Sequence, residues 1–164
     1  MLNSVRQRTS DEGGFTLIEL LVVILIIGIL AAIAIPAFLS QKSKAYDSSA
    51  KTVAQTAQTA AETYATENGG SYTNMSVSSL EAIEPSLKAS SNEAHLLNVG
   101  LTKPVSTSGA VGTPSATEYT VTAEAANTKD LYSVTRKTNG EVEHSCYSPG
   151  GTGCPNHSKE TSTW

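Results

Sequence analysis

Residues 15–39 read FTLIELLVVILIIGILAAIAIPAFL, and the rest of the chain is organised around this apolar stretch. As a helix, about 25 residues at about 1.5 Å each would span about 37 Å, enough to cross a bilayer core of roughly 30 Å with some tilt. Glu19 lies one turn inside the stretch, where a carboxylate is costly in lipid. The sequence therefore predicts a membrane-spanning helix in which Glu19 has a function.

The residues that lead into this helix form a motif. Gly14 ends a polar leader, Phe15 begins the apolar run and Glu19 follows four residues later. This GFTLIE motif resembles the cleavage and methylation motif of type IV prepilins and type II secretion pseudopilins, and the resemblance is dense over residues 13–44. It implies that a prepilin peptidase cuts between Gly14 and Phe15 and methylates the new amine of Phe15, and that Glu19 acts in filament assembly.

Residues 1–14 are accordingly expected to be a leader peptide. Its arginines, Arg6 and Arg8, favour the cytoplasmic side of a membrane. An ordinary secretory signal peptide, cut in the small-residue stretch 31–34, and a plain membrane anchor are competing interpretations. The apolar run exceeds the usual signal core of about 7–15 residues, and a signal sequence has no use for Glu19, so pilin-type processing is favoured.

Three residues of the apolar helix suggest how it packs. Gly28 and Ala32 are four positions apart, so they share a helix face on which another helix can approach closely. Pro36 removes a backbone donor and should kink or loosen the helix. The family resemblance implies that residues 28–36 can lose helical order inside a filament, whereas a simple kink near the membrane exit is the alternative.

Residues 40–68 are predicted to continue the same helix in amphipathic form, ended by Gly69 and Gly70. Asp47 and Lys51 have the spacing of a favourable surface ion pair. Apolar residues recur at steps of three and four and predict one narrow buried face: Tyr46, Ala50, Val53, Ala57, Ala61 and Tyr64. The polar residues expected mostly elsewhere are Lys44, Lys51, Gln55, Gln58 and Glu62.

Residues 69–164 are predicted to form an extracytoplasmic globular head. A short helix is expected over 76–84, and a three-stranded β-meander over about 118–147, with a half-buried first strand and a tight turn at Thr138-Asn139-Gly140. Residues 106–117, rich in Ser, Thr, Gly and Pro, are expected to form an exposed loop. A further buried edge is expected from Leu96, Leu97, Val99 and Leu101.

The expected fold class is therefore α+β and type IV pilin-like. Its long N-terminal helix has a transmembrane half, residues 15–39, and an amphipathic half, residues 40–68. The amphipathic half packs on a small C-terminal antiparallel β-sheet, because such a sheet needs another element to cover its apolar face.

The two cysteines, Cys146 and Cys154, are expected to form a disulfide, because both lie in the part predicted to be outside the membrane. Two free thiols are the alternative. A zinc site with His144 and His157 is disfavoured by the wide cysteine spacing. Asp130 is the only aspartate after Asp47, which also disfavours a calcium site.

The expected function is structural. We find no catalytic motif and expect no cofactor, and a net charge of −4 gives no case for a nucleic-acid site. The expected partners are further copies of the chain, a prepilin peptidase, the pilus or secretion assembly machinery and membrane lipid. The protein would be a single-pass cytoplasmic-membrane protein and then part of a cell-surface pilus, or of a periplasmic or cell-wall pseudopilus. A pseudopilin of a secretion or DNA-uptake system and a non-polymerising membrane-anchored binding domain are the alternatives.

Overall fold

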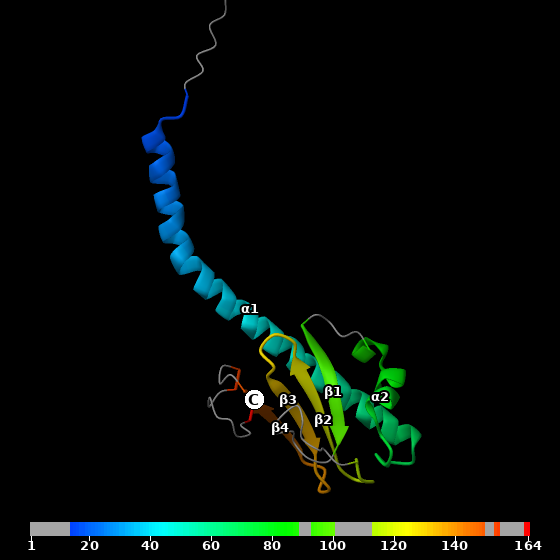
Figure 1. The fold of residues 1–164 in the computed structure, drawn as a ribbon. Coiled ribbons are helices and arrows are strands. Elements are labelled where there is room, and N and C mark those ends of the chain that lie inside the picture. The colour runs from blue at the N-terminus through cyan, green and yellow to red at the C-terminus, as the bar shows by residue number, and fades with distance from the viewer. Residues whose placement is uncertain (1–13, 89–92, 101–112, 150–152, 155–162) are drawn as a thin grey trace, which may run out of the picture. The chain divides into compact units, whose positions relative to one another are not determined.

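The computed structural model describes residues 14–88, 93–100, 113–149, 153–154 and 163–164, and it confirms the predicted α+β fold (Figure 1). The chain divides into two units, residues 1–39 and 40–164. The elements in chain order are α1 (Leu17–Glu67), α2 (Val77–Ile83), the short 3-10 helix η1 (Pro85–Lys88), β1 (Ala94–Gly100), β2 (Tyr119–Ala125), β3 (Leu131–Arg136) and β4 (Val142–Tyr147).

Helix α1 agrees with the helix predicted from the sequence to within two residues at each end. It is continuous through Pro36, so the single chain does not lose helical order there. The loosening expected of residues 28–36 inside a filament stays a prediction. Gly69 and Gly70 follow the end of the helix, as predicted.

The sheet has four antiparallel strands in the order β1-β2-β3-β4, one more than the meander predicted over residues 118–147. The prediction missed β1 as a strand, although it placed a buried edge there. A register shift between Leu96 and Asn98 interrupts the alternation of buried and exposed side chains. A bulge of this kind hides the period of two on which strand prediction relies. Leu101 and most of the predicted loop lie outside the described residues.

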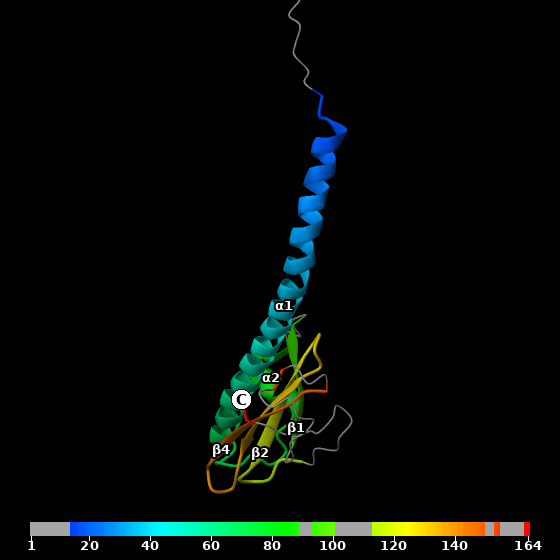
Figure 2. The same cartoon turned by 90° about the vertical axis from the view of Figure 1, so that its left-hand side faces the viewer.

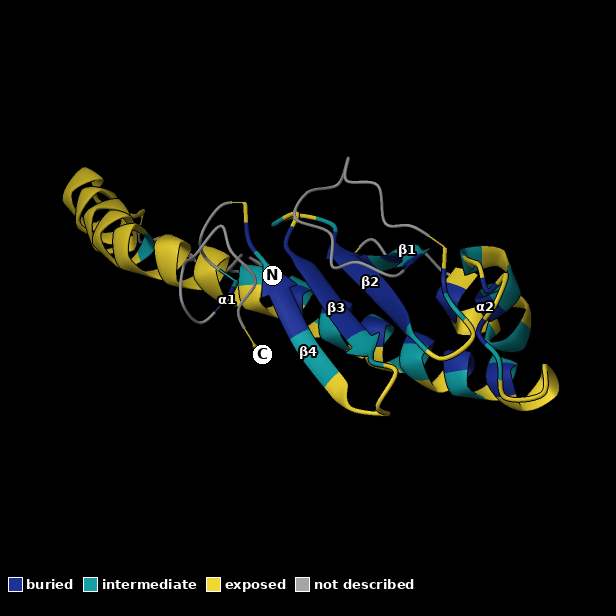
Figure 3. Cartoon of the chain, turned by 90° about the horizontal axis from the view of Figure 1, so that it is seen from below, coloured by how far each residue is buried: buried dark blue, intermediate teal, exposed yellow. Residues whose placement is uncertain are grey.

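The core lies between the sheet and the second half of α1, which Figures 2 and 3 show running along the sheet. The face of α1 turned to the sheet is almost entirely alanine, and the largest fully buried side chains are Tyr119 and Tyr132. Because alanine side chains are short, the large tyrosine rings fill the space between α1 and the sheet. The predicted Tyr46, Val53 and Tyr64 are only partly buried and flank that face. The buried residues of α1 are Asp47, Ala50, Ala54, Ala57, Ala60, Ala61 and Ala65.

Strand β2 is buried on both faces, so the prediction of a half-buried strand was wrong. It lies between β1 and β3, and its polar side chains find partners there. Thr120 bonds to the Thr135 hydroxyl at 2.9 Å and Thr122 to the Ser133 hydroxyl at 2.8 Å. Cross-strand hydroxyl pairs satisfy each other, which allows a polar face to be covered without loss of hydrogen bonding.

The β3–β4 turn occurs at residues 138–140, as predicted. The Gly140 N–H donates to the Lys137 carbonyl at 2.9 Å, and the Lys137 N–H donates to the Glu141 carbonyl at 2.9 Å. Within the turn only Gly140 has a positive φ, of 84°. The hairpin therefore has a three-residue loop that ends in a left-handed glycine.

Candidate functional site

Thr16 and Glu19 form a reciprocal hydrogen-bonded cap at the start of helix α1. The Glu19 N–H donates to the Thr16 hydroxyl oxygen at 3.2 Å. In return, Oε2 of Glu19 accepts from the Thr16 backbone N–H at 2.8 Å and from its hydroxyl at 2.7 Å. This is a capping box, which satisfies backbone donors that have no partner inside the helix. The capping role of Thr16 was not predicted, although Thr-x-x-Glu before an apolar run signals it.

The cap fixes where the Glu19 carboxylate lies. Both bonds from Thr16 reach the same oxygen, Oε2, and within the described residues no hydrogen bond to Oε1 is found. Phe15, directly before the cap, is 89% exposed. The motif thus holds the Glu19 carboxyl group with one oxygen available, close to the exposed Phe15.

Residues 15–39 form a large exposed apolar surface. Side chains all round this part of α1 are exposed, from Leu17 at 82% to Phe38 at 68%. By length and apolar composition, α1 is a candidate membrane span. Such a surface requires lipid or other protein chains to cover it. Within the described part of the chain, a Cβ at Gly28 would meet no atom within 4 Å, so the packing role expected of Gly28 and Ala32 stays a prediction.

Glu62 links the second half of α1 to the sheet by hydrogen bonds. It was among the polar residues predicted to lie mostly outside the buried face. Its Oε2 accepts from the Tyr72 hydroxyl at 2.8 Å, and its Oε1 accepts from the Tyr119 hydroxyl at 2.9 Å. The Arg136 guanidinium lies 3.4 Å from Oε1 and stacks over the Tyr72 ring. Burial, followed by these bonds to Glu62, raises the pKa of Tyr72 to about 12 and that of Tyr119 beyond its ordinary range. Both phenols therefore remain donors at physiological pH.

Replacing Glu62 by alanine should destabilise the head by about 1–2 kcal/mol, because the buried Tyr119 hydroxyl would lose its acceptor. Urea unfolding of the full chain in detergent, followed by near-ultraviolet circular dichroism, would measure the change. Glu67→Ala is the matched control, since Glu67 lies on the same helix but is exposed. Equal stability of the two variants would contradict this role for Glu62.

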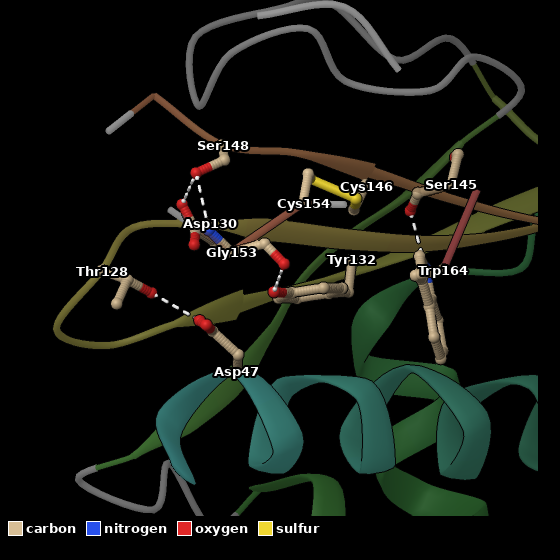
Figure 4. Close-up of a disulfide and its surroundings, with 10 residues drawn as sticks. All are labelled: Asp47, Thr128, Asp130, Tyr132, Ser145, Cys146, Ser148, Gly153, Cys154 and Trp164. Atoms are coloured by element: carbon tan, nitrogen blue, oxygen red, sulfur yellow. Dashed lines mark hydrogen bonds between the residues drawn. A yellow bond between two sulfur atoms is a disulfide. The ribbon is translucent and has the colours of Figure 1, made fainter. Parts of the chain in front are cut away.

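Cys146 and Cys154 form a disulfide, as predicted, with Cα atoms 5.9 Å apart (Figure 4). The alternatives of free thiols and a zinc site are therefore wrong. His144 packs against the Trp164 ring with centroids 4.7 Å apart, and His157 lies outside the described residues. No group of three or more potential metal-binding side chains occurs in the described part of the chain.

The disulfide fixes Gly153 against the sheet. The Gly153 carbonyl accepts from the Tyr132 hydroxyl at 3.2 Å, and its N–H donates to the Ser148 hydroxyl oxygen at 3.3 Å. The Ser148 hydroxyl in turn donates to Oδ1 of Asp130 at 2.6 Å. A polar network thus joins the segment containing Cys154 to β3, and of its members the sequence had drawn attention only to Asp130, in the argument against a calcium site.

Asp47 and Lys51, predicted to form a surface ion pair, instead contact different partners. Asp47 is buried, and its Oδ1 accepts from the Thr128 hydroxyl at 2.8 Å. The Lys51 ammonium lies over two rings, 5.2 Å from the centroid of Tyr132 and 5.3 Å from that of Trp164. The helical spacing was read correctly, but it does not reveal that the sheet covers this turn of the helix.

A long N-terminal helix followed by a four-stranded antiparallel sheet is an arrangement typical of type IV pilins. Residues 9–35 match a family model described as the prokaryotic N-terminal methylation motif. The chain is type IV pilin-like.

One relative carries a more specific name. Over 54 residues the chain is 50% identical to the type IV major pilin protein PilA of Myxococcus xanthus (strain DK1622). The match covers 33% of this chain and 24% of that relative, so the chain spans only about a quarter of its length. No solved structure matches the chain.

Proposed function

We propose that this chain is the structural subunit of a type IV pilus-like filament, cleaved between Gly14 and Phe15 and assembled through its N-terminal helix. The observation that carries the proposal is the exposed apolar surface of residues 15–39, which contains one carboxylate, Glu19, inside the segment that matches the methylation motif. Lipid covers this surface before assembly, and the helices of neighbouring subunits cover it in the filament. The same surface thus serves both states.

Cleavage would change the charge balance at the cap. Phe15 would then carry a cationic amine, which N-methylation does not neutralise, within one turn of the Glu19 carboxylate. A lone charge in lipid or in a filament core is costly, and pairing the two reduces that cost. We propose that Glu19 contacts the amine of a neighbouring subunit and so sets the axial register. Its Thr16 cap pre-orients the carboxylate for this contact.

The head would lie outside the cytoplasmic membrane, held there by the helix until assembly by the pilus machinery. Its disulfide agrees with an oxidising compartment. A long surface filament that is absent from a deletion strain would support the pilin. Loss of secreted enzymes without loss of filaments would indicate a secretion pseudopilin instead, and a protein that never polymerises would indicate a membrane-anchored binding domain.

Processing is the most direct test of this proposal. Mass spectrometry of protein from its native host should find a chain that starts at Phe15 and is N-methylated. Gly14→Val should block cutting, because glycine permits the close backbone approach that a peptidase site requires. Gly13→Val is the neighbouring control and should have the smaller effect. A mature chain that retains Met1, or one that begins after Ala34, would contradict the proposal.

A further inference from the structure

We propose that Asp47 and Asp130 share one proton. This proton stabilises the packing of Gly153 and Cys154 against the sheet and helix α1, so that the packing is more stable at acidic than at alkaline pH. The two carboxyl groups come from distant parts of the chain. Asp47 lies on α1, and Asp130 lies immediately before β3. Figure 4 shows both beside Tyr132 and Gly153. The inference does not depend on whether the chain forms filaments.

Asp130 has the environment of a neutral acid rather than of a carboxylate. It is 0% exposed, and only Oδ1 is satisfied, by the Ser148 hydroxyl at 2.6 Å. Oδ2 is buried and has no hydrogen-bond partner among the described residues. A buried carboxylate oxygen without a donor is unfavourable, whereas a proton on Oδ2 would make that oxygen a donor.

Gly153 closes the site above Oδ2. A Cβ at this position would overlap Oδ2 of Asp130 and would lie 2.7 Å from the Tyr132 hydroxyl oxygen. Only glycine fits here without displacing these groups, so the backbone covers the carboxyl group and keeps water away. The disulfide to Cys146 holds the neighbouring Cys154, and hence this cover, in place.

Asp47 is the natural acceptor for the proton. It is 8% exposed, and the Thr128 hydroxyl satisfies its Oδ1 at 2.8 Å. Burial raises the pKa of both carboxyl groups, and the negative charge of Asp47 raises that of Asp130 further. Two like charges in one buried site cannot easily ionise together, so a shared proton is the expected state.

The surrounding charges decide which group keeps the proton. Lys44 and Lys51 line the same surface hollow as Asp47 and Gly153, and the charge of Lys51 favours ionised Asp47. Lys129, adjacent to Asp130 in the chain, is paired with Glu124 at 2.8 Å. Among the described residues, no cation is paired with Asp130. The proton therefore belongs on Asp130, donated toward Asp47, while the Tyr132 phenol remains neutral because burial raises its pKa.

The sign of the pH effect follows from the raised pKa of Asp130. Between the ordinary aspartate range and the raised value, the folded chain binds more protons than the unfolded chain. The stabilisation is complete below the ordinary range and is lost as pH rises through the raised pKa. Above it, two carboxylates face each other beneath Gly153, and the segment that contains Cys154 loosens.

The titration can be observed directly, because the chain contains only three aspartates, Asp11, Asp47 and Asp130. The full chain, labelled with carboxyl-13C aspartate and held in detergent micelles, would be titrated by NMR. We expect one signal to remain protonated after the Asp11 signal has fully ionised, and Asp130→Asn to remove that signal. Ionisation of all three signals in the ordinary acidic range would overturn the proposal, whether or not any variant folds.

Variants test the consequence for stability. Asparagine at 130 keeps an acceptor for Ser148 and supplies an N–H donor for Asp47, so it mimics the protonated acid. The unfolding temperature of the wild type should fall by a few degrees or more as pH rises from the ordinary aspartate range through the raised pKa of Asp130, and that of Asp130→Asn should fall clearly less. Glu67→Gln, which changes an exposed carboxylate near the end of α1, should keep the wild-type dependence.

Two results would overturn the proposal in this second experiment. One is an equal pH dependence in the wild type and Asp130→Asn. The other is a rise in the wild-type unfolding temperature at alkaline pH when millimolar calcium or magnesium is added, with no such rise in Asp130→Asn. That result would show that the two carboxylates hold a metal ion rather than a proton.

Discussion

Replacing Glu19 by alanine should reduce sheared surface filaments to a small fraction of the wild-type yield, while leader removal and membrane insertion continue. Without its partner, the Phe15 amine would enter the filament core as an unpaired charge, which is strongly unfavourable. The neutral side chain makes the monomer more compatible with lipid, so loss of expression is not expected. The measurement compares sheared filaments with membrane-held subunits in the two strains.

Two further variants separate charge pairing from helix capping. Glu19→Gln keeps an acceptor for Thr16 and can form a capping box, but it carries no charge. Thr16→Ala removes the cap partner and keeps the carboxylate. Charge pairing predicts that Glu19→Gln assembles as poorly as Glu19→Ala and that Thr16→Ala assembles better than either. Normal filament yield from Glu19→Ala, with no helper pilin incorporated, would show that Glu19 has no assembly role.

Replacing both cysteines by serine should cost the head about 2–3 kcal/mol, as the chain-entropy estimate gives for a sequence separation of 8 residues. The loss has a specific location, because the bridge positions Gly153 over Asp130 and Tyr132. Protease sensitivity should rise first in the C-terminal segment. Limited proteolysis and thermal unfolding of the full chain in detergent would measure both effects.

The double serine variant is preferable to Cys146→Ser alone, which leaves a reactive thiol at Cys154. Leader cleavage should be unchanged in either variant, because the cleavage motif is far away in the sequence. A second control is Ser145→Ala, which changes a hydroxyl beside the bridge and leaves the bridge intact. If the double variant were as stable and protease-resistant as Ser145→Ala, the bridge would not stabilise the head.

The sequence predicted the elements whose signals are local. The apolar run predicted the first half of α1, and the recurrence of small and apolar residues at steps of three and four predicted its second half. The Asn139-Gly140 pair predicted the last hairpin. Ser76, whose side chain accepts from the Ser79 N–H, caps α2 where a short helix was expected. Each of these features depends on neighbours within a few positions, so a single sequence contains the necessary information.

The interactions that unite the head were not predictable in the same way. Glu62 and Tyr119 are 57 positions apart, and Asp47 and Thr128 are 81 apart. A glutamate on an alanine-rich helix is usually solvent-exposed, and no local pattern shows that two tyrosine hydroxyls reach it. Likewise Gly153 resembles any loop glycine until the fold places Asp130 beneath it. Only the capping role of Thr16 was visible in the sequence and overlooked.

The attachment points between α1 and the sheet have a mechanical consequence for a subunit under load. Asp47 and Glu62 are fifteen positions apart, so their tethers lie about 22 Å apart along the helix axis. Between them runs the alanine face that the tyrosines cover. If the proposed filament is stretched along its axis, the force acts along α1. The contacts of Asp47, of Glu62 and of the alanine face would then have to break together rather than one after another. The force would be shared by the hydrogen bonds of Asp47 and Glu62 and by the packed alanine face between them. The head should therefore resist tension better than the size of its core suggests.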